Sequence, residues 1–301
     1  MKKIQYRIEY LFYQILSMTI VLLPRKIIAS LAVFFGLFLY YSGVRKKIIE
    51  TNLNIAFGDT LNRKALKKIR KKTCINAAIV AFEFIYLKRL KLSQLKNYIK
   101  LSGLELLEEA LQEEKGVIVA GNHFGNWELI SGAISYFGTP MYMFTGMQKN
   151  LLIDNAINDI RRKFGTVTIS KAKSAAFDMM RALKQNKPLG MAGDLNVPHD
   201  NLFVNFFGKK AVVGQGLATF ALKRKAPLLF IWSVRESPFN YKGYLKRIDY
   251  QISGDQQQDL ERLAQSISDE LEDKIRQNPD QYFWFNRRWK TRPADDPDRV
   301  Y

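Results

Sequence analysis

Five short apolar runs alternate with helical stretches between residues 116 and 231, and this alternation constrains the fold more than any other feature of the chain. The runs cover residues 116–121, 140–144, 166–169, 188–192 and 227–231. Helical stretches separate most of them, near residues 126–136, 150–164, 172–186 and 215–225. Such alternation predicts an α/β fold, with a mixed, mostly parallel sheet flanked by helices.

The segments on either side of this region favour helices. Residues 44–99 place apolar side chains at helical spacing in a lysine-rich stretch without a strand signal. Residues 255–277 carry one apolar stripe of a long helix, made of Leu260, Leu263, Ala264, Ile267, Leu271 and Ile275. We find no repeat and no linker, so residues 45–301 are expected to form one domain.

Two uncharged, mostly apolar runs precede this domain, at residues 10–24 and 27–44. A helix needs about 20 apolar residues to cross a bilayer, so the second run is a marginal span and the first is too short. No clear cleavage site follows them, which argues against a signal peptide. We expect residues 1–44 to be a membrane anchor, either a hairpin or a single transmembrane helix. A pair of buried core helices is the alternative.

The net charge of +19 points to an anionic partner. The chain has 47 Lys and Arg against 28 Asp and Glu, and residues 45–301 keep 42 against 27. Such an excess fits either an anionic leaflet or nucleic acid. A basic, membrane-anchored nucleic-acid-binding protein is therefore an alternative. The charges are dispersed, however, and no base-reading signature is present, so no nucleic-acid partner is expected.

Residue counts and missing motifs exclude several chemistries. One cysteine, Cys74, and two histidines, His123 and His199, cannot form a Cys/His zinc cluster, and no metal or other cofactor is expected. The chain has no Gly-x-Ser-x-Gly elbow and no phosphate-binding P-loop. The glycine pair at Gly214 and Gly216 lacks the third glycine of a dinucleotide pattern. Because the chain has only two histidines, a histidine general base must be His123 or His199.

His123 and Glu128 stand in the turn that follows the run at 116–121, where ligands gather in α/β sheets. If His123 lies in the turn and Glu128 in the first or second helical turn, Gly125 allows the bend that brings them together. The carboxylate then orients the imidazole, whose other nitrogen removes a proton from a hydroxyl. The sequence therefore predicts a catalytic dyad. His199 has no partner at this spacing.

Other polar residues are candidates for substrate contact. Asp194 follows an apolar run, and Arg161 and Arg162 have the forked donors that suit a phosphate. Amide groups near Gly125 and Asn126 are expected to stabilise an oxyanion. Residues 282–293 interleave aromatic and basic side chains, which indicates either a packed final helix or contact with lipid headgroups. The basic residues considered there are Arg287, Arg288 and Lys290.

Several ordered blocks over residues 45–293 resemble the bacterial lipid A late acyltransferases, within the wider group of glycerolipid acyltransferases marked by His, four residues, then Asp or Glu. Asn-His-Phe-Gly-Asn-Trp-Glu at 122–128 looks like the family signature. Arg162, Gly165 and Asp194 match further blocks, as do 206–211 and 282–293. Two positions depart from the pattern: Asn286 stands where the family usually has His, and Leu195 where Gln is common.

The resemblance implies transfer of an acyl chain from an acyl carrier protein thioester to a hydroxyl of a lipid A precursor. It also implies an enzyme at the inner membrane, with the catalytic domain on the cytoplasmic face. His123 is then the general base, Glu128 orients it, and no acyl-enzyme forms. The expected acceptor is an anionic, phosphorylated glycolipid. A lysophospholipid or other glycolipid acyltransferase that uses acyl-CoA remains open.

Overall fold

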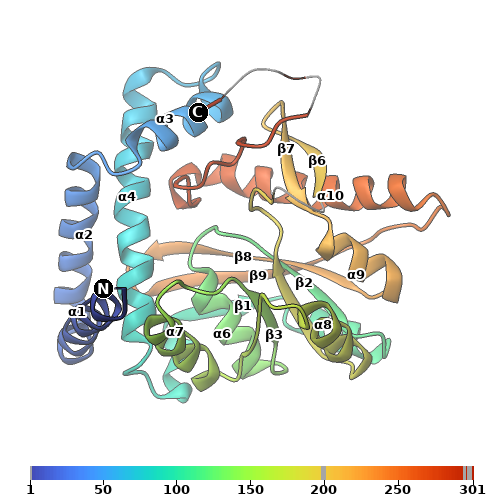
Figure 1. Cartoon of the computed structure of the whole chain (residues 1–301), viewed down its shortest axis with the longest axis horizontal. Helices are drawn as coiled ribbons and strands as arrows, with labels where there is room; N and C mark the ends of the chain where they lie inside the picture. Colours follow the sequence, from blue (N-terminus) through green and yellow to red (C-terminus); the bar gives the residue numbers. More distant parts are fainter. Residues whose placement is uncertain (1, 198–200, 294–295, 297–299) are drawn as a thin grey trace.

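The computed structural model describes residues 2–197, 201–293, 296 and 300–301. His199 lies outside this part of the chain. A sheet with the strand order β1-β9-β8-β2-β5-β3-β4 forms its centre (Figure 1). Its strands are β1 (Ile99–Ser102), β2 (Val117–Gly121), β3 (Tyr142–Thr145), β4 (Val167–Ser170), β5 (Pro188–Ala192), β8 (Leu228–Ser237) and β9 (Asn240–Ile248).

The predicted fold class is confirmed for the sheet and its helices. Within this seven-stranded sheet, the described strand pairs are parallel apart from β8 with β9, which run antiparallel. The helices that follow strands or pack on the sheet are α5 (Glu105–Gln112), α6 (Trp127–Phe137), α7 (Leu151–Lys163), α8 (Ala175–Lys184), α9 (Gly216–Arg224) and α10 (Gln256–Gln277). Figure 1 shows α10 above the sheet and α6 and α7 below it.

Alternate side chains of β2 enter two different apolar cores, as expected for a strand buried on both faces. Ile118 and Ala120 pack in the core shared with α8, α9 and α10. Val117 and Val119 pack in the core shared with α5, α6 and α7. All four side chains are fully buried, so β2 is held firmly at the centre of the sheet.

Four elements are absent from the sequence prediction. β1 begins at Ile99, where the stretch expected to be helical ends, and β9 extends the sheet beyond β8. β6 (Asn201–Phe206) and β7 (Lys209–Gly214) form a separate antiparallel hairpin. Residues 282–293 contain no helix, so the expected final helix is wrong. They are nevertheless well packed, because Trp284 and Trp289 are completely buried.

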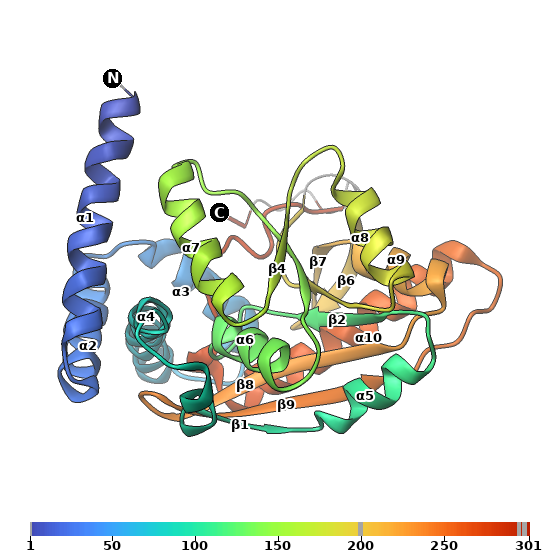
Figure 2. The same ribbon diagram turned by 90° about the horizontal axis from the view of Figure 1, so that it is seen from below.

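The amino-terminal helices are α1 (Lys2–Leu22), α2 (Arg25–Tyr41), α3 (Lys46–Phe57) and α4 (Arg63–Tyr86). α2 lies close along α4: a Cβ added at Gly36 would come within 2.4 Å of the Ile75 Cα. α1 runs across α2 instead of beside it (Figures 1 and 2). Within the described residues, no helix alone has the length and apolar character of a bilayer span. In the described part of the chain, α2 and α3 meet that test only together, as a pair bent by 89°.

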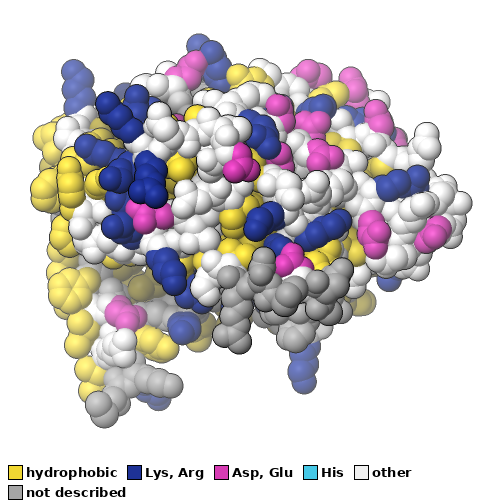
Figure 3. All heavy atoms as spheres, turned by 90° about the horizontal axis from the view of Figure 1, so that it is seen from above, with side chains coloured by type: hydrophobic (Ala, Val, Ile, Leu, Met, Phe, Trp, Pro, Cys, Tyr) yellow, Lys and Arg dark blue, Asp and Glu magenta, His cyan; other side chains and the backbone are white. Residues whose placement is uncertain are grey.

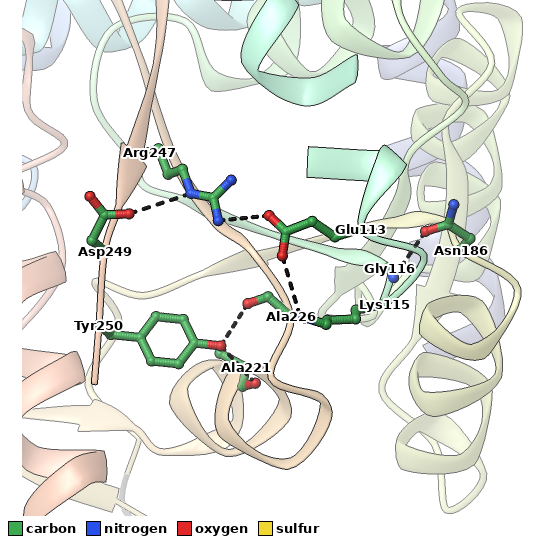
Figure 4. A network of polar contacts seen from close by, with 9 residues as sticks. All are labelled: Glu113, Lys115, Gly116, Asn186, Ala221, Ala226, Arg247, Asp249 and Tyr250. Carbon is green, nitrogen blue, oxygen red and sulfur yellow. Dashed lines mark hydrogen bonds and ion pairs between the residues drawn. The ribbon is translucent and has the colours of Figure 1, made fainter. Parts of the chain in front are cut away.

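α4 stands at the end of the sheet where the parallel strands finish. In Figure 1 the arrowhead of β8 points at α4, and in Figure 2 that of β2 does so too. Polar pairs tie the opposite end together (Figure 4). Arg247 there bridges Glu113 at 2.7 Å and Asp249 at 3.4 Å. The predicted site, which follows the carboxyl end of β2, therefore lies at the end of the sheet that faces α4.

Candidate active site

The turn after β2 is built around Gly125. Its φ of +63° is in the left-handed region, and a Cβ there would lie 1.9 Å from the Ser233 carbonyl oxygen. Only glycine fits this position. The Gly125 amide donates to the Gln281 carbonyl at 3.0 Å, and the Phe283 amide donates to the His123 carbonyl at 2.9 Å. The turn is thus fixed against β8 on one side and the 281–283 segment on the other.

His123 is paired with Asp194. The two atoms His123 Nδ1 and Asp194 Oδ1 are 2.8 Å apart, and the His123 amide donates to Asp194 Oδ2 at 3.0 Å. β2 and β5 are neighbouring parallel strands, so the residues just beyond their carboxyl ends meet. The Asp194 side chain is 1% exposed and that of His123 is 22% exposed. A buried carboxylate therefore holds an imidazole that remains accessible.

The electrostatics of this pair increase the affinity of the His123 imidazole for a proton. Burial disfavours the charged ring, but the charge and hydrogen bond of Asp194, with the charge of Glu128, outweigh it and raise the pKa of His123. Burial also opposes ionisation of Asp194. The His123 imidazole, its two hydrogen bonds and the charge of Arg288 nevertheless lower the pKa of Asp194. Because an ionised carboxylate only accepts, Nδ1 carries the proton and Nε2 is left for chemistry.

The expected direct pairing of His123 with Glu128 is wrong. Glu128 instead accepts two hydrogen bonds from Arg161, from Nε at 2.9 Å and from Nη2 at 2.5 Å. As the second residue of α6, Glu128 faces α7, which carries Arg161, and Asp194 already occupies Nδ1 of His123. Glu128 still lines the same cavity as His123 and acts on it through its charge.

The Arg161–Glu128 pair is expected to stabilise the fold, because both side chains are nearly buried, at 16% and 10% exposure. Arg161→Gln leaves the Glu128 carboxylate without its cation, and we expect the free energy of unfolding to fall by about 3 kcal/mol. Urea unfolding followed by circular dichroism measures this. Arg162→Gln is the control, because its pair with Asp159 is exposed. If both variants lose the same free energy of unfolding, the Arg161–Glu128 pair does not have the stabilising role expected here.

An apolar cavity of about 570 Å³ adjoins the pair. Side chains of α4, including Val80 and Phe84, form one wall, and strand ends at Gly121, Thr145 and Ala192 form another. Four methionines line it: Met141, Met143, Met147 and Met191. Flexible thioether side chains suit an apolar ligand of variable shape. The cavity therefore has the chemistry of a site for a hydrocarbon chain beside a proton acceptor.

The predicted oxyanion donors are engaged elsewhere. The Gly125 amide is bound to Gln281, and the Asn126 amide donates to Ser233 Oγ at 2.9 Å. The Asn126 side chain is buried and caps α6 by accepting from the Leu129 amide at 3.0 Å. Asn126 therefore shapes the turn, and its predicted direct contact with substrate is wrong.

The remaining predicted residues divide between surface and interior. Arg162 pairs with Asp159 on the surface, and Gly165 lies two residues beyond the end of α7 with a φ of +86°. Neither lines the cavity. Arg287 and Lys290 are exposed. Arg288 is 1% exposed and donates to the Val212 carbonyl, so contact with a headgroup is wrong for it. It lies beside Asp194 instead, where its charge helps to keep the carboxylate ionised.

Among the described residues, no three His, Cys, Asp or Glu side chains converge as a metal site. This α/β protein thus places an imidazole, held by a buried carboxylate, beside an apolar cavity. Such a site suits proton removal from a substrate that carries a hydrocarbon chain. Arg161 adds a cation to the cavity wall, and Leu195 lines the cavity as well.

Comparison with known proteins narrows this class. A family model described as bacterial lipid A biosynthesis acyltransferase matches residues 1–291. The lipid A biosynthesis palmitoleoyltransferase of Escherichia coli (strain K12) is 27% identical over 207 residues, which cover 68% of this chain and 65% of that protein. The lipid A biosynthesis acyltransferase of Shigella flexneri gives the same values. The lipid A biosynthesis lauroyltransferase of Escherichia coli (strain K12) is 25% identical over 289 residues, covering 93% and 90% of the two chains.

The chain belongs to the family of bacterial lipid A biosynthesis acyltransferases. The predicted family is confirmed across almost the whole chain. The matched segment spans slightly less than two thirds of the palmitoleoyltransferase, at 65%, and most of the lauroyltransferase, at 90%.

Proposed function

We propose that this protein transfers a fatty acyl chain from an acyl carrier protein thioester to a hydroxyl of a lipid A precursor. The observation that carries the proposal is the His123–Asp194 pair at the wall of the 570 Å³ apolar cavity. The family and the names of its relatives supply the substrate class.

In the mechanism, Asp194 holds Nδ1–H of His123, and Nε2 removes the proton of the acceptor hydroxyl. The acceptor oxygen attacks the thioester carbonyl, a new C–O bond forms, and the C–S bond breaks as the tetrahedral intermediate collapses. The imidazolium returns its proton to the departing thiolate. The chain needs no acyl-enzyme, because the base activates the acceptor directly. Glu128 strengthens the basicity of His123 through its charge.

Acceptor phosphates are assigned to Arg287 and Lys290. Both are exposed and belong to the same segment as Phe283, which lines the cavity. Arg161 stays a candidate for phosphate or for the developing negative charge on the thioester oxygen. Its two bonds to Glu128 fix the orientation of its guanidinium in the cavity wall.

The choice of donor and acceptor is tested with purified protein. Acyl carrier protein thioester and acyl-CoA are each offered with a lipid A precursor or with a lysophospholipid, and the lipid products are weighed by mass spectrometry. We expect ester formation on the lipid A precursor, fastest with the carrier protein thioester. Transfer to the lysophospholipid alone, or from acyl-CoA alone, favours the glycolipid or phospholipid alternative.

We also propose that the protein works at the cytoplasmic face of the inner membrane, held there by α1 and α2. These helices expose large apolar side chains, among them Phe12 at 70%, Leu22 at 79% and Phe38 at 60%. Such exposure is typical of a surface that contacts a membrane or another protein. The assignment of residues 1–44 as a separate anchor is part of this proposal, although α2 also packs on α4.

A cluster of nine exposed cations borders this apolar surface. We name it the basic cluster: Arg45, Lys46, Lys47, Arg63, Lys64, Lys67, Lys68, Lys71 and Lys72. None of the nine pairs with an acidic group in the part of the chain described. Arg70 between them stacks on the Tyr40 ring of α2, 4.1 Å from its centroid. Figure 3 shows Lys and Arg side chains gathered beside the apolar edge of the molecule.

The basic cluster is expected to favour anionic vesicles. Replacing Lys67, Lys68, Lys71 and Lys72 by glutamine should weaken binding to phosphatidylglycerol-containing vesicles at least about tenfold, since each basic residue near a leaflet adds about 1 kcal/mol. Cosedimentation measures the binding. The matched control replaces four exposed lysines elsewhere: Lys209, Lys210, Lys223 and Lys225. If both sets of exchanges weaken vesicle binding equally, the basic cluster has no special role in that binding. If the wild-type protein does not bind the vesicles, the membrane proposal is contradicted.

A further inference from the structure

Glu83 is a buried carboxylate behind the turn that carries His123. It lies on α4 with 4% exposure and receives three hydrogen bonds. The Phe239 amide donates to Oε1 at 2.6 Å. The Tyr241 hydroxyl at 2.6 Å and the Asn126 Nδ2 at 2.9 Å donate to Oε2. All three partners act as donors, so this surrounding matches an acceptor-only group.

The bond from Asn126 decides which way its amide points. With Nδ2 turned to Glu83, Oδ1 faces the Leu129 amide and caps α6. A reversed amide would place an NH₂ group against that amide and lose the cap. The first residues of α6 after this cap are Trp127 and Glu128, and both line the cavity.

Glu83 does not itself line the cavity, although Ala81 and Phe84 of the same helix do. It is therefore placed to act through another residue and not on the substrate. The route is short, because Asn126 is three residues from His123 and the intervening Gly125 is already in close contact with Ser233. The segment has little freedom to absorb a change at Asn126 without moving the site.

We propose that Glu83 is a positioning residue for acyl transfer, which fixes the Asn126 amide and thereby sets His123, Trp127 and Glu128 toward the cavity. The inference rests on the proposed function, whose reacting groups it positions. The Glu83 carboxylate links α4, β9 and the turn that carries His123. One group therefore aligns the α4 wall of the cavity with the general base His123. A small displacement of reacting groups is enough to cost about 100-fold in rate.

The test uses three variants: Glu83→Gln, Asn126→Asp and the double variant that carries both exchanges. Tyr241→Phe is the control for all three. In Glu83→Gln, the one remaining acceptor oxygen cannot serve both the Phe239 amide and the Asn126 amide, so an NH₂ group must face one of these two donors. Asn126→Asp presents a second carboxylate to Glu83. We expect each single exchange to lower kcat by about 10-fold to 100-fold, with the donor KM nearly unchanged. In the double variant, the introduced glutamine donates to the introduced aspartate, which still caps α6. Its kcat should return to within about threefold of wild type.

Tyr241→Phe is the matched control, because it removes a donor to the same oxygen of Glu83 while leaving the Asn126 bond. We expect its melting temperature to fall and its kcat to stay within about twofold of wild type. The acid limb of the pH–rate profile should be unmoved in Glu83→Gln, since the His123–Asp194 bond is intact.

Three results would overturn the positioning role. They are a wild-type kcat in both folded single variants, Glu83→Gln and Asn126→Asp, an equal loss in Tyr241→Phe, and a folded double variant no faster than Asn126→Asp. If a single exchange does not fold, the double variant and Tyr241→Phe still decide between the outcomes. No acyl transfer by the wild type is a different result, which rejects the proposed function itself.

Discussion

His123→Ala is expected to lower kcat for acyl transfer by about 10²-fold to 10⁴-fold, the range that positioned general bases contribute. The His123 imidazole lines the cavity and is bonded through Nδ1 to the buried Asp194 carboxylate. Without it, the acceptor hydroxyl keeps its proton and attacks the thioester poorly. Steady-state rates with the carrier protein thioester and a lipid A precursor measure the effect.

The control for this variant is Arg162→Ala, which changes an exposed residue of α7 outside the cavity lining. It should keep the wild-type rate. Circular dichroism and thermal melting must show that His123→Ala is folded. If the folded variant retains more than about a tenth of the wild-type kcat, His123 is not the base.

Asp194→Asn is expected to lower kcat by up to about 10⁴-fold, by reversing the imidazole tautomer. Asp194 accepts from both Nδ1 and the amide of His123. An asparagine has one acceptor oxygen, so its NH₂ group must face one of these two donors. If it faces the ring, Nδ1 becomes the acceptor and the proton moves to Nε2, the nitrogen needed for catalysis.

The same variant should move the pH dependence. In the wild type, Asp194 raises the pKa of His123, and the base works only when neutral, so kcat/KM rises as the pH rises through that raised pKa. Once the carboxylate charge is gone, burial remains and lowers the pKa of the ring. The acid limb of the pH–rate profile therefore shifts to lower pH while the plateau falls. An acid limb at the same pH in both proteins would contradict the Asp194 assignment.

Much of the architecture is readable from local patterns. The apolar run before His123 predicts β2, and Gly125 predicts the bend that follows it. The strand β9 was missed because charged residues occupy its exposed positions, at Lys242 and Lys246 for example. The sequence analysis does not predict the hairpin β6–β7, because its two strands pair with each other and lie outside the alternation of strands and helices.

The sequence predicts His123 at the site, but it does not predict Asp194 as the carboxylate that pairs with it. Spacing favoured Glu128, which is five residues from His123, whereas Asp194 is 71 residues away. Their contact depends on β2 and β5 being neighbours in the sheet, and strand order is not written in local periodicity. The position of Asp194 after an apolar run was a usable signal. Nothing local distinguishes buried Arg288 from exposed Arg287 beside it.

The most direct test of the central claim is mass spectrometry of lipid A precursor after incubation with the purified protein and an acyl carrier protein thioester. The account predicts a product heavier by one ester-linked acyl chain in the wild type, formed at least about a hundredfold more slowly by folded His123→Ala. No acylated product from the wild type, or equal amounts from the two proteins, would contradict it.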